Sequence, residues 1–427
     1  MRKIIQYILK IISRLVIKKY KPRIIGITGS VGKTTTKEAI FSVLSKKYRV
    51  GKSIKNYNNE IGLPLSILGF ESPGKNIFSW LALFGAGLMM IIKTDKFYPE
   101  ILVLEMGIDR PGDMDYLNSI VKCDMGVVTN IGISHIEYFG TTQKIKKEKA
   151  KLIENLKKKG LAIINFDNPK SREIIKDSRE KVLTFGLNEG ADVRADEIKF
   201  RFDYQNAGFS GMNFKLRYMG SVVPVFINSS VGFHLIYASL IATIVARELG
   251  MNLLEVSEAL KDFKSPRGRL NLLEGINHSI IIDDTYNASP QSTIQALEIL
   301  SEMKTSEARK IVVLGDMLEL GDEKIDEHTK IGRLVAKSEA DMLLCYGDLA
   351  KNICAGAIKA KMNKKNVLGF KTQKELFLSL KNELRKNDII LVKGSQGARM
   401  EKIVKALLAN KESAEKLLVR QDGSWLK

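Results

Sequence analysis

The clearest candidate for chemistry in this chain is a glycine-rich turn that ends in lysine and threonine. It lies in residues 26–40, GITGSVGKTTTKEAI, between an apolar run and a helix-forming segment. Its predicted nucleotide contacts are Gly29, Ser30, Val31, Gly32, Lys33, Thr34 and Thr35. Glycines let backbone N–H groups curl around phosphate oxygens, and the following helix N-terminus adds a partial positive charge. Lys33 would reach the β- and γ-phosphates and the Thr34 hydroxyl would bind Mg²⁺, although Ile27 replaces the first glycine of the strict GxxxxGK[ST] pattern.

Polar side chains follow the next two apolar runs at the points where a phosphate site would need them. Glu105 ends ILVLE, Asn130 lies near the end of the run at 126–131, and His135 comes five residues after Asn130. The carboxyl ends of parallel strands meet at one edge of a sheet, so Glu105 is predicted beside the loop as a Mg²⁺ ligand. Asn130 is predicted to contact the nucleotide. A lone histidine is more often structural, but in this company His135 is predicted to bind a metal ion or phosphate.

The elements that must position these residues alternate between short β-branched runs and amphipathic helical stretches. The expected buried strands of a first domain are at 23–29, 101–105, 126–131 and 161–166. Such alternation predicts a doubly wound, mostly parallel sheet. Residues 197–227 alternate with period two instead, which predicts antiparallel strands appended to that domain, and a helix is expected over 234–249.

A second series of strands and helices begins after the segment KSPRGRL (264–270), which resembles a linker. Its expected strands are at 280–283, 311–315, 342–346, 366–370 and 388–394. The predicted fold class is therefore α/β, with a P-loop central domain and a C-terminal Rossmann-like α/β domain, preceded by an amphipathic helix. The predicted domains are 1–22, 23–268 and 269–427.

The charge of the chain narrows the classes of partner. The 427 residues carry 68 Lys and Arg against 48 Asp and Glu, a net charge of +20. That excess suits nucleic acid, an anionic membrane or anionic small substrates. No aromatic-interleaved platform or helicase motif accompanies it, so nucleic acid is not an expected partner. The three cysteines lack CxxC spacing and there are four histidines, which argues against a disulfide framework or a zinc site and suits the cytoplasm.

Two apolar segments raise the question of membrane contact. Residues 1–23 hold eight basic residues and no acid, with isoleucines at helical spacing. The functional interpretation is peripheral contact of residues 1–20 with an anionic lipid surface, and the alternative is a helix packed on its own domain. Residues 77–92 are uncharged but shorter than the roughly 20 residues needed to span a bilayer. A buried or interfacial helix is the prediction there.

Several motifs, in order, resemble those of the Mur ligases, the ATP-dependent amide-forming enzymes of peptidoglycan precursor synthesis. The resemblance covers about residues 23–410. It rests on TGSVGKTTT, NYNNEIGLPLSIL, VLEMG, TNIGISHIEYFG, DDTYNASPQS, VLGDMLELG and VKGS. It implies that a substrate carboxylate attacks the γ-phosphate of ATP and that an amine then displaces phosphate from the acyl phosphate.

The resemblance also implies roles for residues of the first domain. Thr34 and Glu105 would hold one Mg²⁺, and His135 would help to hold a second. A carbamylated lysine supports the second ion in the family, and Lys149 is the best match. Lys151 is the rival, because residues 144–159 contain eight lysines and are otherwise typical of a solvated basic helix.

Further residues are assigned by the same resemblance to ATP and to the two other substrates. Arg269 would touch ATP phosphate, with Arg267 as the alternative. Asp283 or Asp284 would address the ribose, and Tyr286 and Asn287 would shape the adjoining loop. The residues expected to bind the peptide and the amine are Asn59, Glu60, Asp316, Glu319, Lys393 and Ser395.

Three departures from the family pattern qualify the expected substrates. The phosphate loop begins near residue 26, whereas the family has a uridine-nucleotide domain before it. The expected acceptor is therefore UDP-linked or lipid-linked, and the alternative is that a partner protein supplies the uridine-nucleotide domain. Leu235 and Ala238 replace two asparagines that help to read adenine. Gln396 replaces the arginine of the KGSR motif, so the amine is D-Ala-D-Ala or a similar compound.

The predicted function is therefore an ATP-dependent carboxylate–amine ligase of peptidoglycan precursor synthesis. It would join an amino acid or dipeptide amine to a peptide-glycan carboxylate, using ATP and two Mg²⁺ ions. The predicted location is the cytoplasm, with the inner face of the membrane as a finer expectation. A weakly active scaffold subunit at the membrane is the alternative, and the sequence leaves the oligomeric state open.

Overall fold

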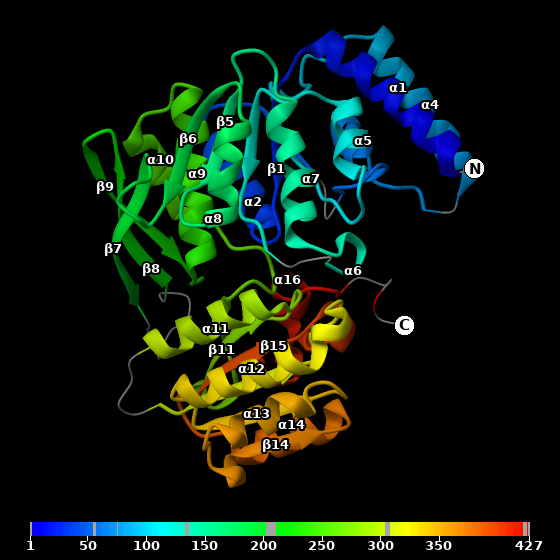
Figure 1. The fold of residues 1–427 in the computed structure, drawn as a ribbon. Helices are drawn as coiled ribbons and strands as arrows, with labels where there is room; N and C mark the ends of the chain where they lie inside the picture. Colours follow the sequence, from blue (N-terminus) through cyan, green and yellow to red (C-terminus); the bar gives the residue numbers. More distant parts are fainter. Residues whose placement is uncertain are drawn as a thin grey trace. The chain divides into compact units, whose positions relative to one another are not determined.

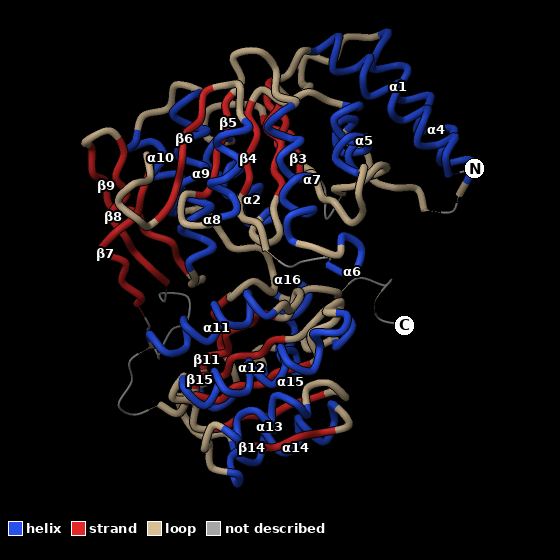
Figure 2. The backbone as a smooth tube through the Cα atoms, in the orientation of Figure 1, coloured by secondary structure: helices blue, strands red, loops and turns tan. Residues whose placement is uncertain are grey.

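The computed structural model describes residues 2–53, 57–74, 76–132, 136–201, 211–303, 308–421 and 425. They form two compact units. The first comprises Met1–Glu197, Lys215–Val225 and His234–Phe263, and the second comprises Ile198–Phe214, Phe226–Phe233 and Lys264–Lys427. Figures 1 and 2 show the course of the chain through each unit.

The first sheet has nine strands in the order β2-β3-β1-β4-β5-β6-β7-β8-β9. The strands are β1 (Arg23–Thr28), β2 (Val50–Lys52), β3 (Ile101–Glu105), β4 (Met125–Val128), β5 (Leu161–Asn165), β6 (Lys181–Gly186), β7 (Val193–Arg201), β8 (Gly211–Tyr218) and β9 (Ser221–Asn228). The pairings from β2 through β7 are parallel. Strands β3, β4 and β5 are buried along their whole length, as expected for a parallel sheet covered on both faces.

The end of this sheet contains the strands that the period-two pattern predicted. Only Met219 and Gly220 join β8 to β9, with φ of 47° and 78°. A parallel crossover needs about a dozen residues, so β8 and β9 are antiparallel. Positive φ at both turn positions is the geometry of a tight hairpin turn.

The helices of the first part of the chain follow the strands at short intervals. They are α1 (Arg2–Tyr20), α2 (Lys33–Leu44), α3 (Gly62–Leu68), α4 (Ile77–Ile92), α5 (Asp113–Ile120), α6 (Ile136–Phe139), α7 (Thr142–Glu154), α8 (Pro169–Glu173), α9 (Phe233–Glu248) and α10 (Leu253–Lys261). Side-chain caps fix several starts: Asn76 accepts from the amides of Phe78 and Ser79 at α4, and Thr141 caps α7. Among the described residues, no helix combines the length and hydropathy that crossing a bilayer requires.

Helices α1 and α4 are both only partly buried. In α1 the apolar residues do not form one face: Leu9, Ile12 and Val16 are buried, whereas Ile4 and Leu15 are exposed. The helix is therefore packed on its own domain through one stripe only. Helix α4 has the predicted extent, but only Trp80, Leu83 and Gly87 of its residues are buried.

The second sheet has six strands in the order β10-β11-β15-β12-β13-β14. The strands are β10 (Asn271–Glu274), β11 (Ile280–Asp284), β12 (Lys310–Gly315), β13 (Met342–Tyr346), β14 (Val367–Phe370) and β15 (Ile389–Lys393). All pairings are parallel except that of β10 with β11, an antiparallel edge that the sequence did not predict. The predicted α/β class, with mostly parallel sheets, is confirmed.

Two helical layers cover this sheet and separate its core into two parts. The helices are α11 (Pro290–Glu302), α12 (Lys324–Lys337), α13 (Lys351–Lys359), α14 (Gln373–Glu383), α15 (Glu401–Leu407) and α16 (Ala414–Leu417). In β12, Val312 and Leu314 pack with α11, α12 and α13, whereas Ile311 and Val313 pack with α14 and α15. Successive side chains of β12 point to opposite faces of the sheet, so this one strand contributes to the hydrophobic core on each face.

Candidate active site

The phosphate loop is held in shape by the ends of two neighbouring strands. The amide of Ser30 donates to the carbonyl of Asn130 at 3.0 Å, and the amide of Val31 donates to Asn130 Oδ1 at 2.8 Å. Thr129 Oγ1 donates to the carbonyl of Val31 at 2.6 Å. Gly29 has a φ of 148°, and a Cβ there would lie 1.9 Å from Thr129 Oγ1. Only glycine fits this close approach, so the predicted loop is a preformed backbone cradle.

Lys33 and Thr34 start helix α2 directly after this cradle. Gly32, in the left-handed region with φ of 84°, precedes the helix, and no acidic residue occupies its first turn. Lys33 Nζ donates to the carbonyl of Gly29 at 2.7 Å, which folds the lysine back over the loop. A helix N-terminus with an overlying ammonium group suits a bound phosphate.

The structure brings together the two predicted Mg²⁺ ligands. Thr34 Oγ1 donates to Glu105 Oε2 at 3.1 Å, and Glu105 is 3% exposed at the end of β3. Asn58 Nδ2 approaches Glu105 Oε1 at 3.4 Å, and the Glu105 amide donates to Ser53 Oγ at 3.0 Å. A hydroxyl and a buried carboxylate are hard oxygen donors of the kind Mg²⁺ prefers. The residues present therefore fit the ion.

Lys149 of α7 is the most unusual titratable group near the loop. It is 2% exposed, although lysines are almost never fully buried without a partner. Burial and the neighbouring charge of Lys33 hold the pKa of Lys149 well below its usual range, against the opposing effect of Asp109 and Glu148. Burial and the like charge of Lys33 therefore both favour the uncharged form of its amine.

Lys151, the alternative candidate for carbamylation, has a different environment. Lys151 Nζ lies 2.6 Å from Asp115 Oδ2 and 2.7 Å from Glu148 Oε2. Burial opposes the shift, but these hydrogen bonds raise the pKa of Lys151. The structure therefore distinguishes a buried amine with a lowered pKa at position 149 from an ion-paired amine with a raised pKa at position 151.

Other predicted residues of the first unit have structural partners or lie outside the described chain. Asn59 Oδ1 accepts from the amides of Ile61 and Gly62, which caps α3. Glu60 pairs with Arg2 of α1 at 2.7 Å. His135 lies outside the described residues. Within the described chain, no group of three or more His, Cys, Asp and Glu forms a metal cluster.

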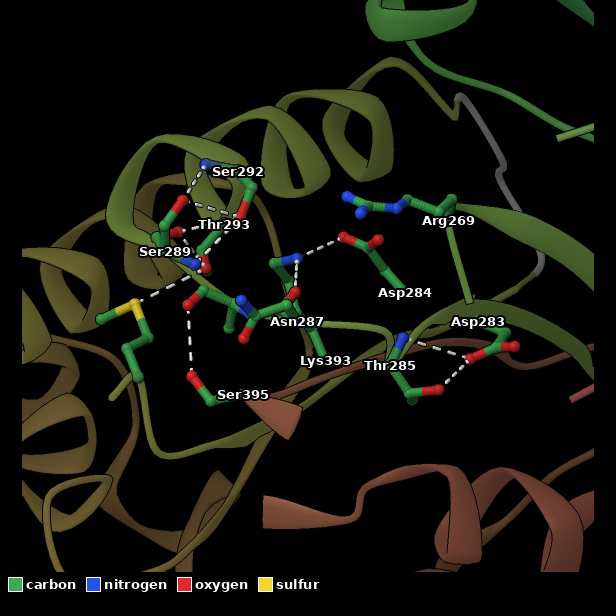
Figure 3. Close-up of polar contacts among 12 residues, drawn as sticks. Arg269, Asp283, Asp284, Thr285, Asn287, Ser289, Ser292, Thr293, Lys393 and Ser395 are labelled. Atoms are coloured by element: carbon green, nitrogen blue, oxygen red, sulfur yellow. Dashed lines mark hydrogen bonds and ion pairs between the residues drawn. The ribbon is translucent and has the colours of Figure 1, made fainter. Parts of the chain in front are cut away.

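A second polar cluster lies at the carboxyl ends of β11 and β15 (Figure 3). The register pairs Asp284 with Lys393, and Lys393 Nζ donates to Asp284 Oδ2 at 2.6 Å and to the carbonyl of Asn287 at 2.9 Å. Burial lowers the pKa of Lys393. Ser395 Oγ donates to the carbonyl of Ala288 at 3.2 Å. One hydrogen-bond network thus contains four of the predicted site residues: Asp284, Asn287, Lys393 and Ser395.

Asp283 and Arg269 flank this network in different ways. Asp283 is fully buried, and its Oδ1 accepts from Thr285 Oγ1 at 2.6 Å, while Oδ2 has no hydrogen-bond partner among the described residues. Burial raises the pKa of Asp283 to about 7. The Arg269 guanidinium lies 4.2 Å from the centre of the Tyr286 ring. Arg267 instead donates to the carbonyl of Glu415, so Arg269 is the arginine associated with the cluster.

Asp316 and Glu319, the other predicted amine-binding residues, follow β12. Asp316 Oδ1 accepts from the amides of Leu349 and Ala350, just before α13, at 3.1 and 2.7 Å. The Asp316 carbonyl accepts from Ser395, and Ser395 Oγ accepts from the amide of Leu318. Glu319 has a positive φ of 63° in the same loop. Asp316 therefore shapes this loop as well as being a candidate ligand.

Sequence reasoning missed three residues at these sites. Asn58 contacts Glu105, and the negative charge of Asp109 raises the pKa of Lys149 against the effect of burial. Arg420 donates to the carbonyls of Thr285 and Tyr286 and pairs with Glu401. Asn58 lies inside the NYNNEIGLPL motif and could have been singled out there, whereas nothing in the local sequence marks Arg420.

Comparison with known proteins assigns the chain to a family. Residues 27–78 and 87–246 match the Mur ligase middle domain, and residues 268–396 match the Mur ligase glutamate ligase domain. The UDP-N-acetylmuramoyl-tripeptide–D-alanyl-D-alanine ligase of Bacillus subtilis is 31% identical over 387 residues, 90% of this chain and 76% of that protein. This chain belongs to the Mur ligase family.

Solved structures agree with the sequence match. The MurF ligase of Thermotoga maritima in complex with ADP is similar with a TM-score of 0.77 and 27% identity, covering 96% of this chain and 84% of that one. MurF from Acinetobacter baumannii is similar with a TM-score of 0.76 and 26% identity, covering 93% and 79%. The predictions of a Mur ligase fold and of an ATP-dependent ligase in peptidoglycan precursor synthesis are confirmed.

Proposed function

We propose that this Mur ligase joins D-alanyl-D-alanine, or a similar amine, to the terminal carboxylate of a peptide-glycan. The observation that carries the proposal is the preformed loop, with Lys33, Thr34 and Glu105 in contact range at its end. The relatives named for D-alanyl-D-alanine addition support the choice of amine, since the Bacillus subtilis protein covers 90% of the chain.

The phosphoryl step needs positioning and charge neutralisation, which these residues can supply. The substrate carboxylate oxygen attacks the γ-phosphorus of ATP, and ADP leaves. Backbone amides of the loop and Lys33 hold the phosphates in line. Thr34 and Glu105 would hold Mg²⁺, which offsets the negative charge on the transferring group. The amine then attacks the acyl carbon, phosphate leaves, and the nitrogen loses a proton.

Lys149 is proposed to carry a carbamate that helps to hold a second Mg²⁺. A carbamate forms when a neutral amine adds to CO₂ and loses a proton, so the lowered pKa of Lys149 favours it. The modification converts a buried cation into an oxygen ligand and removes the repulsion with Lys33. His135 is proposed as a partner in that site. Lys151 does not meet the requirement because its amine is ion-paired.

Residues of the second unit are proposed to handle ATP and the amine. Asp284 and Asn287 would address the nucleotide, and Arg269, stacked on Tyr286, would contact a phosphate. Lys393 and its neighbours Ser395, Asp316 and Glu319 are proposed for the amine. Peripheral location at the inner membrane face is proposed separately from the ligase activity. The domain limits 1–22, 23–268 and 269–427 are also a proposal.

The function is tested by phosphate release with peptide-glycan acceptors and D-alanyl-D-alanine. We expect release that depends on both, loss of activity in Lys33→Ala, and normal activity in Lys46→Ala, which changes an exposed lysine paired with Asp262. Hydrolysis that never depends on an amine would refute the ligase proposal. Comparing UDP-linked with lipid-linked acceptors decides between the two acceptor classes.

The carbamate is tested separately by Lys149→Ala and the matched Lys151→Ala. Activity of Lys149→Ala should be low and partly restored by short carboxylates, whereas Lys151→Ala should stay active. Nuclear magnetic resonance of protein incubated with ¹³C-bicarbonate should show a carbamate signal that Lys149→Ala loses. A signal retained in Lys149→Ala would assign the modification to another lysine.

A further inference from the structure

Helix α4 exposes an apolar face that no described part of the chain covers. The exposed fractions are 78% for Phe78, 75% for Ile92 and 61% for Leu81. Ile77, Leu88 and Met89 are 44–51% exposed, and the helix contains no charged residue. Soluble proteins seldom expose contiguous apolar patches unless they mark an interaction site.

Helix α1 adds a second exposed apolar stripe. Ile4, Tyr7, Ile11 and Leu15 follow one another at three- or four-residue spacing and are 40–65% exposed. Residues at that spacing lie on one face of a helix.

The two helices are in direct contact and lie side by side (Figures 1 and 2). A Cβ added at Gly87 would lie 2.8 Å from Ile12 Cγ2, so the α4 backbone approaches α1 closely there. Lys19 Nζ donates to the carbonyls of Met90, Ile91 and Lys93 at 2.8–3.1 Å, which ties the end of α4 to α1. We call the exposed residues together the α1–α4 surface: Ile4, Tyr7, Ile11, Leu15, Ile77, Phe78, Leu81, Leu88, Met89 and Ile92.

The charged residues around the α1–α4 surface are almost all basic. Residues 2–20 and 77–97 hold eight basic residues and one acid, Asp95. The exposed basic residues are Arg2, which pairs with Glu60, and Lys3, Arg14, Lys18, Lys93 and Lys96. Apolar side chains that enter the acyl boundary beside lysines at phosphate level are the features of helices that bind anionic membranes.

This charge pattern favours a lipid surface over a second copy of the chain. A two-fold interface would place the same surface of each copy together and bring two basic sets into apposition. Anionic phosphates would instead neutralise them. We propose that the α1–α4 surface docks this ligase on an anionic lipid surface as a peripheral protein. The docking does not depend on the ligase activity, so either can fail without the other.

The test is co-sedimentation of the full chain with vesicles of phosphatidylglycerol and phosphatidylcholine, and with vesicles of phosphatidylcholine alone. We expect binding to the anionic vesicles that weakens as salt rises and the Debye length falls. The double variant Phe78→Ser with Leu81→Ser should bind at least about tenfold more weakly, because less apolar surface enters the lipid. The charge variant Arg14→Glu with Lys18→Glu should weaken binding mainly at low salt.

Matched controls separate surface from fold. Leu254→Ser changes a 68% exposed leucine on α10 and should bind like the unmodified chain. Circular dichroism melting and phosphate release should be unchanged in the surface variants. Failure of the unmodified chain to bind anionic vesicles, equal binding to neutral vesicles, or full binding by the Phe78 and Leu81 variant would each overturn the proposal. Dimers that the same variant dissociates, without vesicle binding, would assign the surface to a second copy.

Discussion

Asp283 makes the stability of the second unit depend on pH in an unusual direction. Its carboxyl is fully buried, its Oδ2 has no hydrogen-bond partner in the described chain, and burial raises its pKa from 3.8 to about 7. Hydrogen bonds from Thr285 oppose the shift, and the charges of Asp284 and Glu401 reinforce it. The folded state therefore binds a proton that the unfolded state has released at the same pH.

The size of the effect follows from the two pKa values. Between the unfolded value and the folded value the folded state holds more protons, so its stability falls as the pH rises. The shift of roughly three pH units corresponds to about 4 kcal/mol in total. Of this, about 2.5 kcal/mol falls in the interval from about pH 5 to about pH 8, where the chain can be studied.

Asp283→Asn removes the charge and keeps an oxygen that accepts from Thr285. We expect the unfolding free energy of the unmodified chain to drop by about 2.5 kcal/mol more than that of the variant from about pH 5 to about pH 8. Hydrogen exchange of the β11 amides, read by mass spectrometry and corrected for intrinsic rates, reports this opening. Asp348→Asn, at an exposed carboxylate of the same unit, is the control. The same pH dependence in Asp283→Asn and the unmodified chain would refute the reasoning.

Three further predictions concern other parts of the chain. Burial lowers the pKa of His328, so the neutral histidine stabilises the folded chain fully above about pH 6.5 and less as the pH drops below that value. In thermal melts, the melting temperature of His328→Asn should lose this part of the pH dependence. Leu9→Ala should cost about 2–5 kcal/mol in urea unfolding, whereas Ile4→Ala, at an exposed site, should be nearly neutral, and equal effects would contradict the packing of α1. Gly29→Ala would place a Cβ 1.9 Å from a neighbouring hydroxyl, so calorimetry should show greatly weakened ATP binding, while Gly85→Ala, with open space, should bind normally.

The parallel strands and the phosphate loop were predictable because their signals are local. Continuous apolar runs such as 101–104 and 161–164 can be buried on both faces only inside a covered sheet. Strand β1 leads directly into the glycines and Lys33 of the phosphate loop, so the phosphate site was predictable at the end of that strand. The contact between Thr34 and Glu105 followed from the rule that strand ends share one edge.

The roles of the polar loop residues were less predictable because a cap and a ligand use the same atoms. Asn59 and Asp316 accept backbone amides near helix starts, with side-chain oxygens of the type that a substrate-binding residue would also use. The residue type and its position in the sequence do not show whether such an oxygen caps a helix or binds a substrate. Arg420 reaches Thr285 and Tyr286 across 135 and 134 positions of the chain, a contact that only the fold creates.

The missing asparagines of helix α9 have a physical explanation in its burial. Leu235 and Ala238 are both 0% exposed, and eleven of the sixteen residues of the helix are buried. Apolar side chains in that setting stabilise the domain by packing and offer no donor or acceptor to a base. An asparagine at either position would need a polar partner to offset its desolvation. Selection for adenine in this ligase must therefore come from residues other than 235 and 238, and the two substitutions belong to the core of the first unit.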